Sequence, residues 1–415
     1  MRSKQILTIC GVTIAVAAIA LAVGCGSSSS NPSPVPPHLA FNVPVPNVSL
    51  AKSSNFGFDI GGVSGATYFL SDRLNASLDL VNIPTLGLTQ VKPTGANAYA
   101  GQTSSNATSG PDGSNAVGSL IYTGDVNSVK IIDPVAGTLV NNIVVSTTGV
   151  RADEACLDAT HNLYMISSPE EVPPFATFIN TQTQTIVAKV TFTDLAGAPS
   201  AGLEACQYDA ASDTFFVNND GTTANPHGEL NSFSGVDIRK IAAGATVNYT
   251  TLPSVKMYGE GNCDPTGLAL GPGTDIAVGC REGTTAAPLL FLIFNRSTGA
   301  LLASLNAGGG DQVWYDPPTN RYYNAASRWT TSGLAASAGT CSSSSPCAPV
   351  LWIIDASSRT AVLSLAAGNN AHSVAVDPSS GLVFMPYSSS AAPAGCGTCT
   401  ANGFTDGGIS VYATH

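Results

Sequence analysis

The feature that most constrains this chain is a short hairpin pattern that recurs along it. In its clearest copy, residues 371–386 (AHSVAVDPSSGLVFMP), alternating valines indicate a half-buried strand. Residues 377–381 (DPSSG) suit a tight turn, because Asp accepts backbone N–H bonds, Pro presets φ and Gly tolerates a positive φ. The next four residues are expected to form the returning strand. Each copy therefore predicts two antiparallel β-strands.

Further copies follow one another at intervals of 45 to 62 residues, counted between the turn positions Asp158, Asp209, Gly271, Asp316 and Asp377. A degenerate copy of the hairpin begins at Phe58, and residues 109–122 supply one further copy. A second hairpin follows most copies, at residues 131–140, 178–187, 293–302 and 353–362. Four-stranded units that repeat at about 40–50 residues are typical of β-propellers. The sequence therefore predicts an all-β fold, a seven-bladed β-propeller of four-stranded antiparallel blades over residues 49–415.

The last blade of such a ring needs a strand from the other end of the chain. Residues 408–412 are expected to form the third strand of this blade, and residues 41–50 its fourth. This closure would leave no unpaired edge where the two ends meet.

The N-terminus has the layout of an export signal. Arg2 and Lys4 precede an apolar run over residues 6–23, which ends at Leu21-Ala-Val-Gly-Cys25. This ending resembles the bacterial lipoprotein lipobox and implies cleavage before Cys25 and a lipid on its sulfur. We therefore predict a signal peptide over residues 1–24, a lipidated Cys with a Ser/Pro-rich tether over residues 25–48, and an extracytoplasmic protein anchored to a bacterial membrane. A simple transmembrane anchor is the alternative.

The chain is acidic, with 16 Lys and Arg against 27 Asp and Glu, a formal net charge of −11. Such a surface repels nucleic acid and anionic lipid, and it favours cations or basic partners. We therefore expect no nucleic-acid partner. The expected partner is an unknown protein or small-molecule ligand.

Eight of the ten cysteines lie outside the predicted signal and lipid site, an even number that predicts disulfides in an oxidising compartment. Cys263 and Cys280 flank a turn and are expected to pair. Cys156 and Cys206 both follow Glu-Ala at matching heights of neighbouring inner strands, which predicts a bridge between blades. The others lie in two loops and pair either within each loop or between the loops; they are Cys341, Cys347, Cys396 and Cys399. The last two have redox spacing, but no βαβ context supports that interpretation.

A ring of polar residues is predicted at one mouth of the channel. Counting five residues back from each turn reaches the start of the innermost strand, and the positions found are Asp153, Glu204, Thr266, Asp311 and His372. Asp112 falls at the same place in the second blade. Aligning the third blade by its Glu-Ala-Cys segment instead selects Glu154. The blades together would place these side chains in a circle.

Carboxylates and an imidazole that converge on an axis outline a cation site. The candidate ligands are Asp112, Asp153, Glu154, Glu204, Asp311 and His372. Oxygen ligands suit Ca²⁺ or Mg²⁺, and a histidine admits Zn²⁺ or Mn²⁺, so a divalent cation is the one cofactor that the pattern favours. The alternative is that these residues only cap backbone N–H groups at a wet, polar mouth.

Several segments resemble bacterial extracytoplasmic YVTN-repeat propellers, the surface-layer and lactonase-like group. They are SGPDG (109–113), RADE (151–154), EVPPFATFI (171–179), GLE (202–204), GLALGP (267–272), DQVWYDPPTNRYY (311–323) and AHSVAVDP (371–378). Together they cover most of residues 54–413. The resemblance implies architecture more than chemistry. The chain departs from the pattern by its glycines at 61, 62 and 271 and by its extra cysteines.

Two functions follow from these expectations. The first is a membrane-tethered binding or scaffold module that holds a ligand on an acidic channel-mouth face. It is favoured because the sequence has no GxSxG and no HExxH motif. The second is a metal-dependent lactonase or hydrolase, in which a cation at the mouth polarises a carbonyl group and a carboxylate moves protons.

Overall fold

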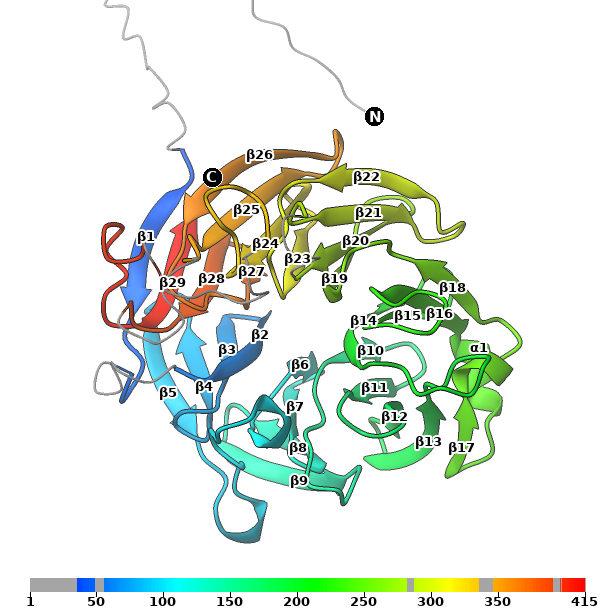
Figure 1. Ribbon diagram of the computed structural model, residues 1–415. Coiled ribbons are helices and arrows are strands. Elements are labelled where there is room, and N and C mark those ends of the chain that lie inside the picture. The colour runs from blue at the N-terminus through cyan, green and yellow to red at the C-terminus, as the bar shows by residue number, and fades with distance from the viewer. Residues whose placement is uncertain are drawn as a thin grey trace, which may run out of the picture. The chain divides into compact units, whose positions relative to one another are not determined.

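The computed structural model describes residues 36–48, 56–281, 287–335, 346–390, 396 and 398–414. The predicted signal peptide, Cys25 and Cys341 lie outside these residues. In the compact unit from Pro36 onward, seven antiparallel blades are arranged around a central axis (Figure 1). The fold is therefore an all-β seven-bladed propeller, as the repeat predicts. No described helix has the length and apolar character needed to span a membrane.

Each blade starts with its innermost strand. Blade 1 consists of β2 Phe58–Ser64, β3 Thr67–Asp72, β4 Ser77–Asn82 and β5 Gly87–Val91. Blade 2 consists of β6 Ser114–Val117, β7 Leu120–Asp125, β8 Ser128–Asp133 and β9 Thr138–Val144. Blade 3 consists of β10 Ala155–Asp158, β11 Leu163–Ser168, β12 Phe175–Asn180 and β13 Thr185–Thr191. Blades 4 and 5 consist of β14 Leu203–Asp209, β15 Thr214–Asn219, β16 Glu229–Ser234 and β18 Lys256–Gly259; and β19 Pro265–Leu270, β20 Asp275–Cys280, β21 Phe291–Asn295 and β22 Leu301–Leu305. Blades 6 and 7 consist of β23 Val313–Asp316, β24 Arg321–Ala326, β25 Val350–Asp355 and β26 Thr360–Ala366; and β27 Ala375–Asp377, β28 Leu382–Tyr387, β29 Gly408–Ala413 and β1 His38–Val43.

The turns between the first and second strands follow the predicted chemistry. In blade 7, Asp377 accepts hydrogen bonds from the backbone N–H groups of Ser379 and Ser380, at 3.1 and 3.2 Å. Gly381 closes this turn with a φ of +66°. Asn162 and Asn320 hold the equivalent positions of blades 3 and 6 with φ values of +58° and +53°. The repeat is therefore defined by a local backbone requirement that Gly and Asn meet most easily.

The ring closes where the N-terminal strand joins the C-terminal one. β1 pairs antiparallel with β29, from His38 opposite Ala413 to Val43 opposite Ile409, and the two strands lie side by side in Figure 1. The third strand of this blade is where the sequence places it. The fourth lies at residues 38–43 instead of 41–50, so the propeller includes residues that were assigned to the tether. Residues 44–48 leave the sheet after Val43, because Pro44 and Pro46 lack the N–H groups that a strand needs.

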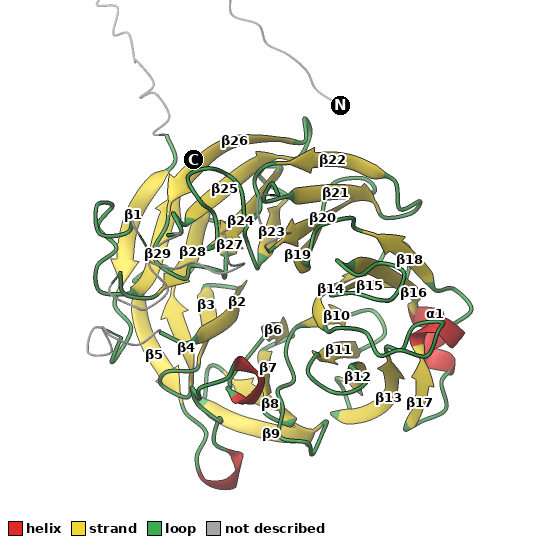
Figure 2. Ribbon diagram, in the orientation of Figure 1, coloured by secondary structure: helices red, strands yellow, loops and turns green. Residues whose placement is uncertain are grey.

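Blade 4 carries an insertion that the repeat does not predict. After β16, the chain forms the short helix α1 Gly235–Lys240, capped by the Ser234 side chain, which accepts a bond from the N–H of Val236. It then forms β17 Ala245–Asn248, which adds to blade 3 as a fifth strand parallel to β13. Figure 2 shows that α1 lies outside the ring. The remaining described helices are short 3₁₀ turns, Gly95–Asn97, Asn106–Thr108 and Tyr249–Thr251.

The core lies between neighbouring blades. Phe178 of blade 3 and Phe215 of blade 4 are both buried and meet edge to face at 5.3 Å between ring centroids. Across the closure, Tyr68 of blade 1 stacks on Phe384 of blade 7 at 4.7 Å. Each blade therefore depends on its two neighbours to cover its apolar faces.

Three disulfides each join two described cysteines, and Cys347 is also disulfide-bonded. Cys156–Cys206 joins the inner strands of blades 3 and 4, and Cys263–Cys280 lies across β19 and β20, the two pairs expected from the sequence. Cys396 pairs with Cys399 within its own loop. This local pairing excludes a cross-link between the two cysteine-containing loops through either of these residues.

We expect loss of β1 to destabilise the ring, because it exposes the edge of β29 and removes the buried side chain of Val43 from the core. A chain that starts at residue 44 should unfold several degrees below one that starts at residue 36, for a cost of about 3 kcal/mol. Thermal melting followed by circular dichroism measures the difference. Equal melting temperatures would show that the closure contributes nothing.

Candidate functional site

A cavity of about 290 Å³ lies at the channel mouth, where the inner strands begin. Its wall includes Asp153, Glu154, Glu204, Asp311 and His372, which are five of the six predicted ligands. The other charged groups of the wall are Asp59, Arg73, Arg151, Arg281 and Arg328. The site is therefore a buried mixture of acids and bases from several blades.

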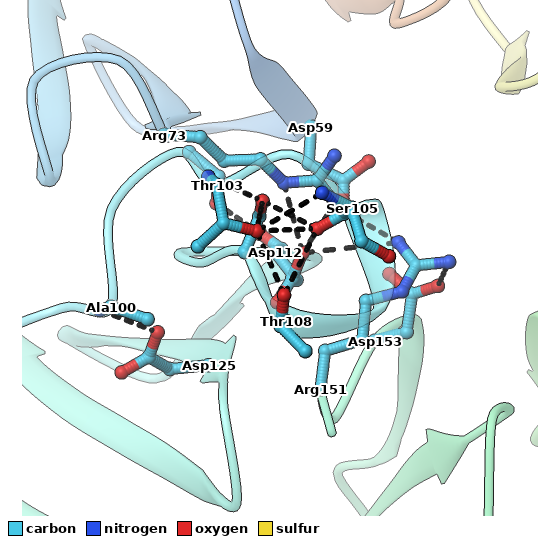
Figure 3. A network of polar contacts seen from close by, with 12 residues as sticks. Asp59, Arg73, Ala100, Thr103, Ser105, Thr108, Asp112, Asp125, Arg151 and Asp153 are labelled. Atoms are coloured by element: carbon cyan, nitrogen blue, oxygen red, sulfur yellow. Dashed lines mark hydrogen bonds and ion pairs between the residues drawn. The ribbon is translucent and has the colours of Figure 1, made fainter. Parts of the chain in front are cut away.

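One half of the site is a salt-bridge network of three aspartates and two arginines (Figure 3). The Arg73 guanidinium donates from Nη2 to Asp59 at 2.9 Å and from Nε to Asp112 at 3.0 Å. Arg151 pairs with Asp153 at 2.7 Å. These residues come from blades 1, 2 and 3, so the network ties three blades together at the mouth.

Burial and charge act against each other in this network. Burial opposes the charge of Arg151, but Asp153 and Asp112 outweigh it and raise its pKa well above the ordinary value. Burial raises the pKa values of Asp112 and Asp153, and the arginines offset this only in part. For Asp59, the arginines outweigh burial and lower the pKa. Asp59 is therefore the most strongly ionised of the three aspartates.

The other half of the site is a cluster of three carboxylates, Glu154, Glu204 and Asp311, which we call the acid triplet. One oxygen of each lies within 4.8 Å of the others. Within the described residues, the triplet forms one ion pair, between Arg281 Nη1 and Glu204 at 3.8 Å. Burial, together with the neighbouring triplet carboxylates, raises the pKa of Glu154 well above its ordinary value. The triplet is thus poorly neutralised compared with the aspartates.

His372 lies between the two halves with a defined orientation. Its ring stacks on Phe58 at 4.4 Å between centroids, and its Nδ1 contacts the backbone carbonyl of Asn370 at 2.7 Å. Since a carbonyl only accepts, Nδ1 carries the proton in the neutral ring and Nε2 has the lone pair. Nε2 lies 4.0 Å from Asp59 Oδ1. His372 can therefore accept a proton or a hydrogen bond at the cavity wall.

The loop between β5 and β6 forms the uncharged side of the cavity. Gly101 and Gly110 pair at its neck, with N–H to carbonyl distances of 2.8 and 3.1 Å. Gln102, Thr103, Ser104, Asn106 and Ser109 beyond this neck line the cavity. Figure 3 shows Thr103, Ser105 and Thr108 of this loop, where the Thr103 hydroxyl donates to the Ser105 carbonyl at 2.8 Å and bonds to the Thr108 hydroxyl at 2.8 Å. The loop therefore brings hydroxyl and amide groups to the cavity wall.

Glycines allow the acidic residues to approach the neighbouring blade. A Cβ on Gly113 would lie 2.5 Å from the carbonyl oxygen of Asp153, and one on Gly267 would lie 2.0 Å from that of Asp311. Any side chain at these positions would push the next blade away. The two glycines therefore hold Asp153 and Asp311 close to the axis.

The structure divides the predicted ligands into groups with different surroundings. Asp112 is fully buried behind the cavity and bonded to Arg73, and Asp153 belongs to the same network. Glu154, and not Asp153, groups with Glu204, in agreement with the alignment on Glu-Ala-Cys. Thr266 donates to the carbonyls of Gly279 and Gly310 and does not line the cavity.

The cavity wall carries positive charge as well as the expected acidic groups. Four arginines line the cavity, and burial together with the neighbouring Arg281 lowers the pKa of Arg328 to about 10. The sequence carried a signal for them, because Arg73, Arg281 and Arg328 follow the ends of second strands, and Arg151 precedes the Asp-Glu pair in RADE. What the sequence lacks is any sign that these side chains turn inward.

Comparisons with known proteins support the fold but identify no family and no activity. No protein-family model and no curated protein matches the chain. Among solved structures, it resembles Kuenenia stuttgartiensis hydrazine synthase, with a TM-score of 0.58 and 12% identity over 92% of this chain and 97% of the other. A chain of the mitotic checkpoint complex gives a TM-score of 0.56 and 10% identity over 90% and 96%. At such identities, the likeness shows a propeller and no shared activity.

The raised pKa values predict how stability depends on pH. A buried acid with a raised pKa holds its proton more tightly in the folded state, so its contribution is lost as pH rises through the folded pKa. We expect the free energy of unfolding, measured with a chelator, to fall as pH rises above about 4.5, because burial and the neighbouring Glu204 raise the pKa of Glu154 well above that ordinary value. Glu154→Gln should make this fall shallower, because the amide does not titrate.

Urea unfolding at several pH values gives the slopes. The control is Asp133→Asn, in the β8–β9 turn, where the side chain accepts N–H bonds that an amide oxygen can also accept. Parallel slopes for Glu154→Gln and Asp133→Asn would contradict the assignment.

Proposed function

We propose that this protein is an extracytoplasmic binding module that holds a small polar ligand in the channel-mouth cavity. The propeller fold suggests a binding or scaffold role, because it presents loops of several blades around one opening. The observation that carries the proposal is the cavity of about 290 Å³ with arginines, carboxylates and an uncharged polar loop in one wall. Such a lining suits a ligand with charged and hydroxyl groups better than an apolar one.

The two halves of the cavity have different roles in this proposal. Arg73 and Arg151 are engaged by aspartates at 2.7–3.0 Å, so they hold the blades in place. The contact of Arg281 with Glu204 is long, at 3.8 Å, and the Arg281 Nε has no hydrogen-bond partner among the described residues. Arg281 and the acid triplet are therefore the groups that remain available to a ligand.

A thermal-shift screen of small charged and hydroxylated compounds tests the proposal. A ligand that raises the melting temperature should lose about 10- to 100-fold in affinity with Arg281→Met or Glu204→Gln, because each change removes a charged hydrogen-bonding group. Asp133→Asn is the matched control on the far face and should bind normally. A ligand that binds equally well to all variants, or a screen without any ligand, would count against this site.

We also propose that the chain is a lipoprotein of the cell envelope, tethered through Cys25, and that it is related to the extracytoplasmic YVTN-repeat propellers. Support comes from the export-signal pattern of the N-terminus and from the disulfides, which persist in oxidising compartments. The opening of the cavity would then face a compartment where small solutes and other envelope proteins are available.

Metabolic labelling with a palmitate analogue checks the anchor. In a bacterial host with lipoprotein processing, the wild-type chain should incorporate label and sediment with membranes, because the thioether lipid is added to Cys25. Cys25→Ser should lose both properties, while Cys10→Ser keeps them. Label on the Cys25→Ser variant would refute lipidation at this residue.

A metal-dependent hydrolase is the second candidate, favoured by the position of the acid triplet near His372. A bound cation would polarise a carbonyl group, and the free Nε2 of His372 would accept a proton. Turnover separates the two functions. Hydrolysis of a lactone or ester that is lost in His372→Asn would support the enzyme, and binding without turnover supports the module.

A further inference from the structure

The acid triplet is short of compensating charge compared with its surroundings. Each aspartate of the neighbouring network has an arginine nitrogen within 3.0 Å. Within the described residues, no hydrogen bond or ion pair reaches the carboxylates of Glu154 and Asp311, and Glu204 has only the contact of 3.8 Å to Arg281. Glu154 is only 8% exposed. An unpartnered buried carboxylate in a cavity wall is costly unless a ligand or a proton neutralises it.

Two other buried atoms of the same cavity wall also have no partner among the described residues. They are Oδ1 of Asp153, a residue that is 2% exposed, and Nε of Arg281. The Asp153 oxygen can accept a hydrogen bond, and the Arg281 N–H needs an acceptor oxygen, which a cation does not offer. Native structures leave few such atoms unsatisfied, so these two indicate a ligand with oxygen and hydroxyl or amino groups beside the ion.

The charge balance indicates the sign of what binds. The cavity wall holds five carboxylates and four arginines. Asp112 behind the wall and Glu170, which Arg151 contacts at 2.9 Å, add two further carboxylates to the same charge cluster. The cluster is therefore negative when all of its groups are ionised, which favours a cation over an anion.

The ligand atoms of the triplet indicate the kind of cation. All three are carboxylate oxygens that can share one coordination sphere, because each lies within 4.8 Å of the others. Hard oxygen ligands suit Ca²⁺ or Mg²⁺, and Ca²⁺ accepts them in an irregular arrangement. Mg²⁺ needs a tighter octahedral shell, and Zn²⁺ prefers nitrogen and sulfur ligands, which the triplet does not provide.

We propose that Glu154, Glu204 and Asp311 bind one Ca²⁺ ion on the channel axis, and that the aspartate network is a structural support and not part of the ion site. Three carboxylates leave part of the six to eight Ca²⁺ ligand positions open. Hydroxyl or carboxylate oxygens of a ligand fill these positions, which makes the ion the anchor of the cavity. This inference rests on the proposed function, because it takes the cavity as the ligand site.

Calorimetric titration with CaCl₂ of the full chain, stripped with a chelator, tests the inference. We expect one Ca²⁺ per chain and a loss of about 10- to 100-fold in affinity for Asp311→Asn or Glu154→Gln. Asp59→Asn, in the aspartate network, should change the affinity less than about threefold. Melting curves of each variant confirm folding, and Asp133→Asn controls for a change in net charge.

The outcomes separate the alternatives. Absence of stoichiometric Ca²⁺, tighter binding of Zn²⁺, Mn²⁺ or Mg²⁺ in parallel titrations, or a greater loss in Asp59→Asn than in Asp311→Asn would overturn the assignment. A compound that still binds the chelator-treated protein when no Ca²⁺ binds would remove this inference and leave the proposed function standing. Ca²⁺ binding without any ligand found in the compound screen would support the ion site and count against the proposed function.

Discussion

The packing of blade against blade is the interaction on which the rest of this structure depends. A four-stranded sheet with apolar residues on both faces cannot stand alone in water, so each blade needs a neighbour on either side. Contacts such as Phe178 against Phe215 meet this need inside the ring, and Tyr68 against Phe384 meets it at the closure. Only a closed circle covers every face. The circle in turn forces the starts of the inner strands to meet at the axis.

Convergence at the axis brings buried acidic side chains close together, and the two halves of the site neutralise their charges to different extents. Acidic side chains from several blades are brought together in a place that water reaches poorly, which raises the free energy of their charged forms. Near blades 1 to 3, Arg73 and Arg151 offset the cost through short contacts with Asp59, Asp112 and Asp153. Near Glu154, Glu204 and Asp311, no comparable contact exists in the described residues. The imbalance separates a supporting half from a binding half.

The fold was predictable from the sequence because its determinants are local. In blades 3, 4, 6 and 7, an Asp begins the turn and an Asn, Asp or Gly with a positive φ ends it four residues later, as at residues 377–381. The alternation of the strands is equally short in range. The start of β1 and the added strand β17 escaped prediction, because an edge strand is selected by the partner it finds and not by its own pattern.

The site was predictable only in part, because part of it depends on contacts between segments that are distant in the sequence. Counting back from the turns located Glu204 in β14, and Asp311 and His372 just before β23 and β27, because the number of residues before the turn brings each of them to the channel mouth. It did not locate Arg73 or Arg151, which lie outside the strands that define the repeat, in the segments that follow β3 and precede β10. Their direction depends on carboxylates of other blades. The repeat therefore predicts where charged residues cluster, whereas the irregular segments between the repeat units determine which of those charges remain unpaired.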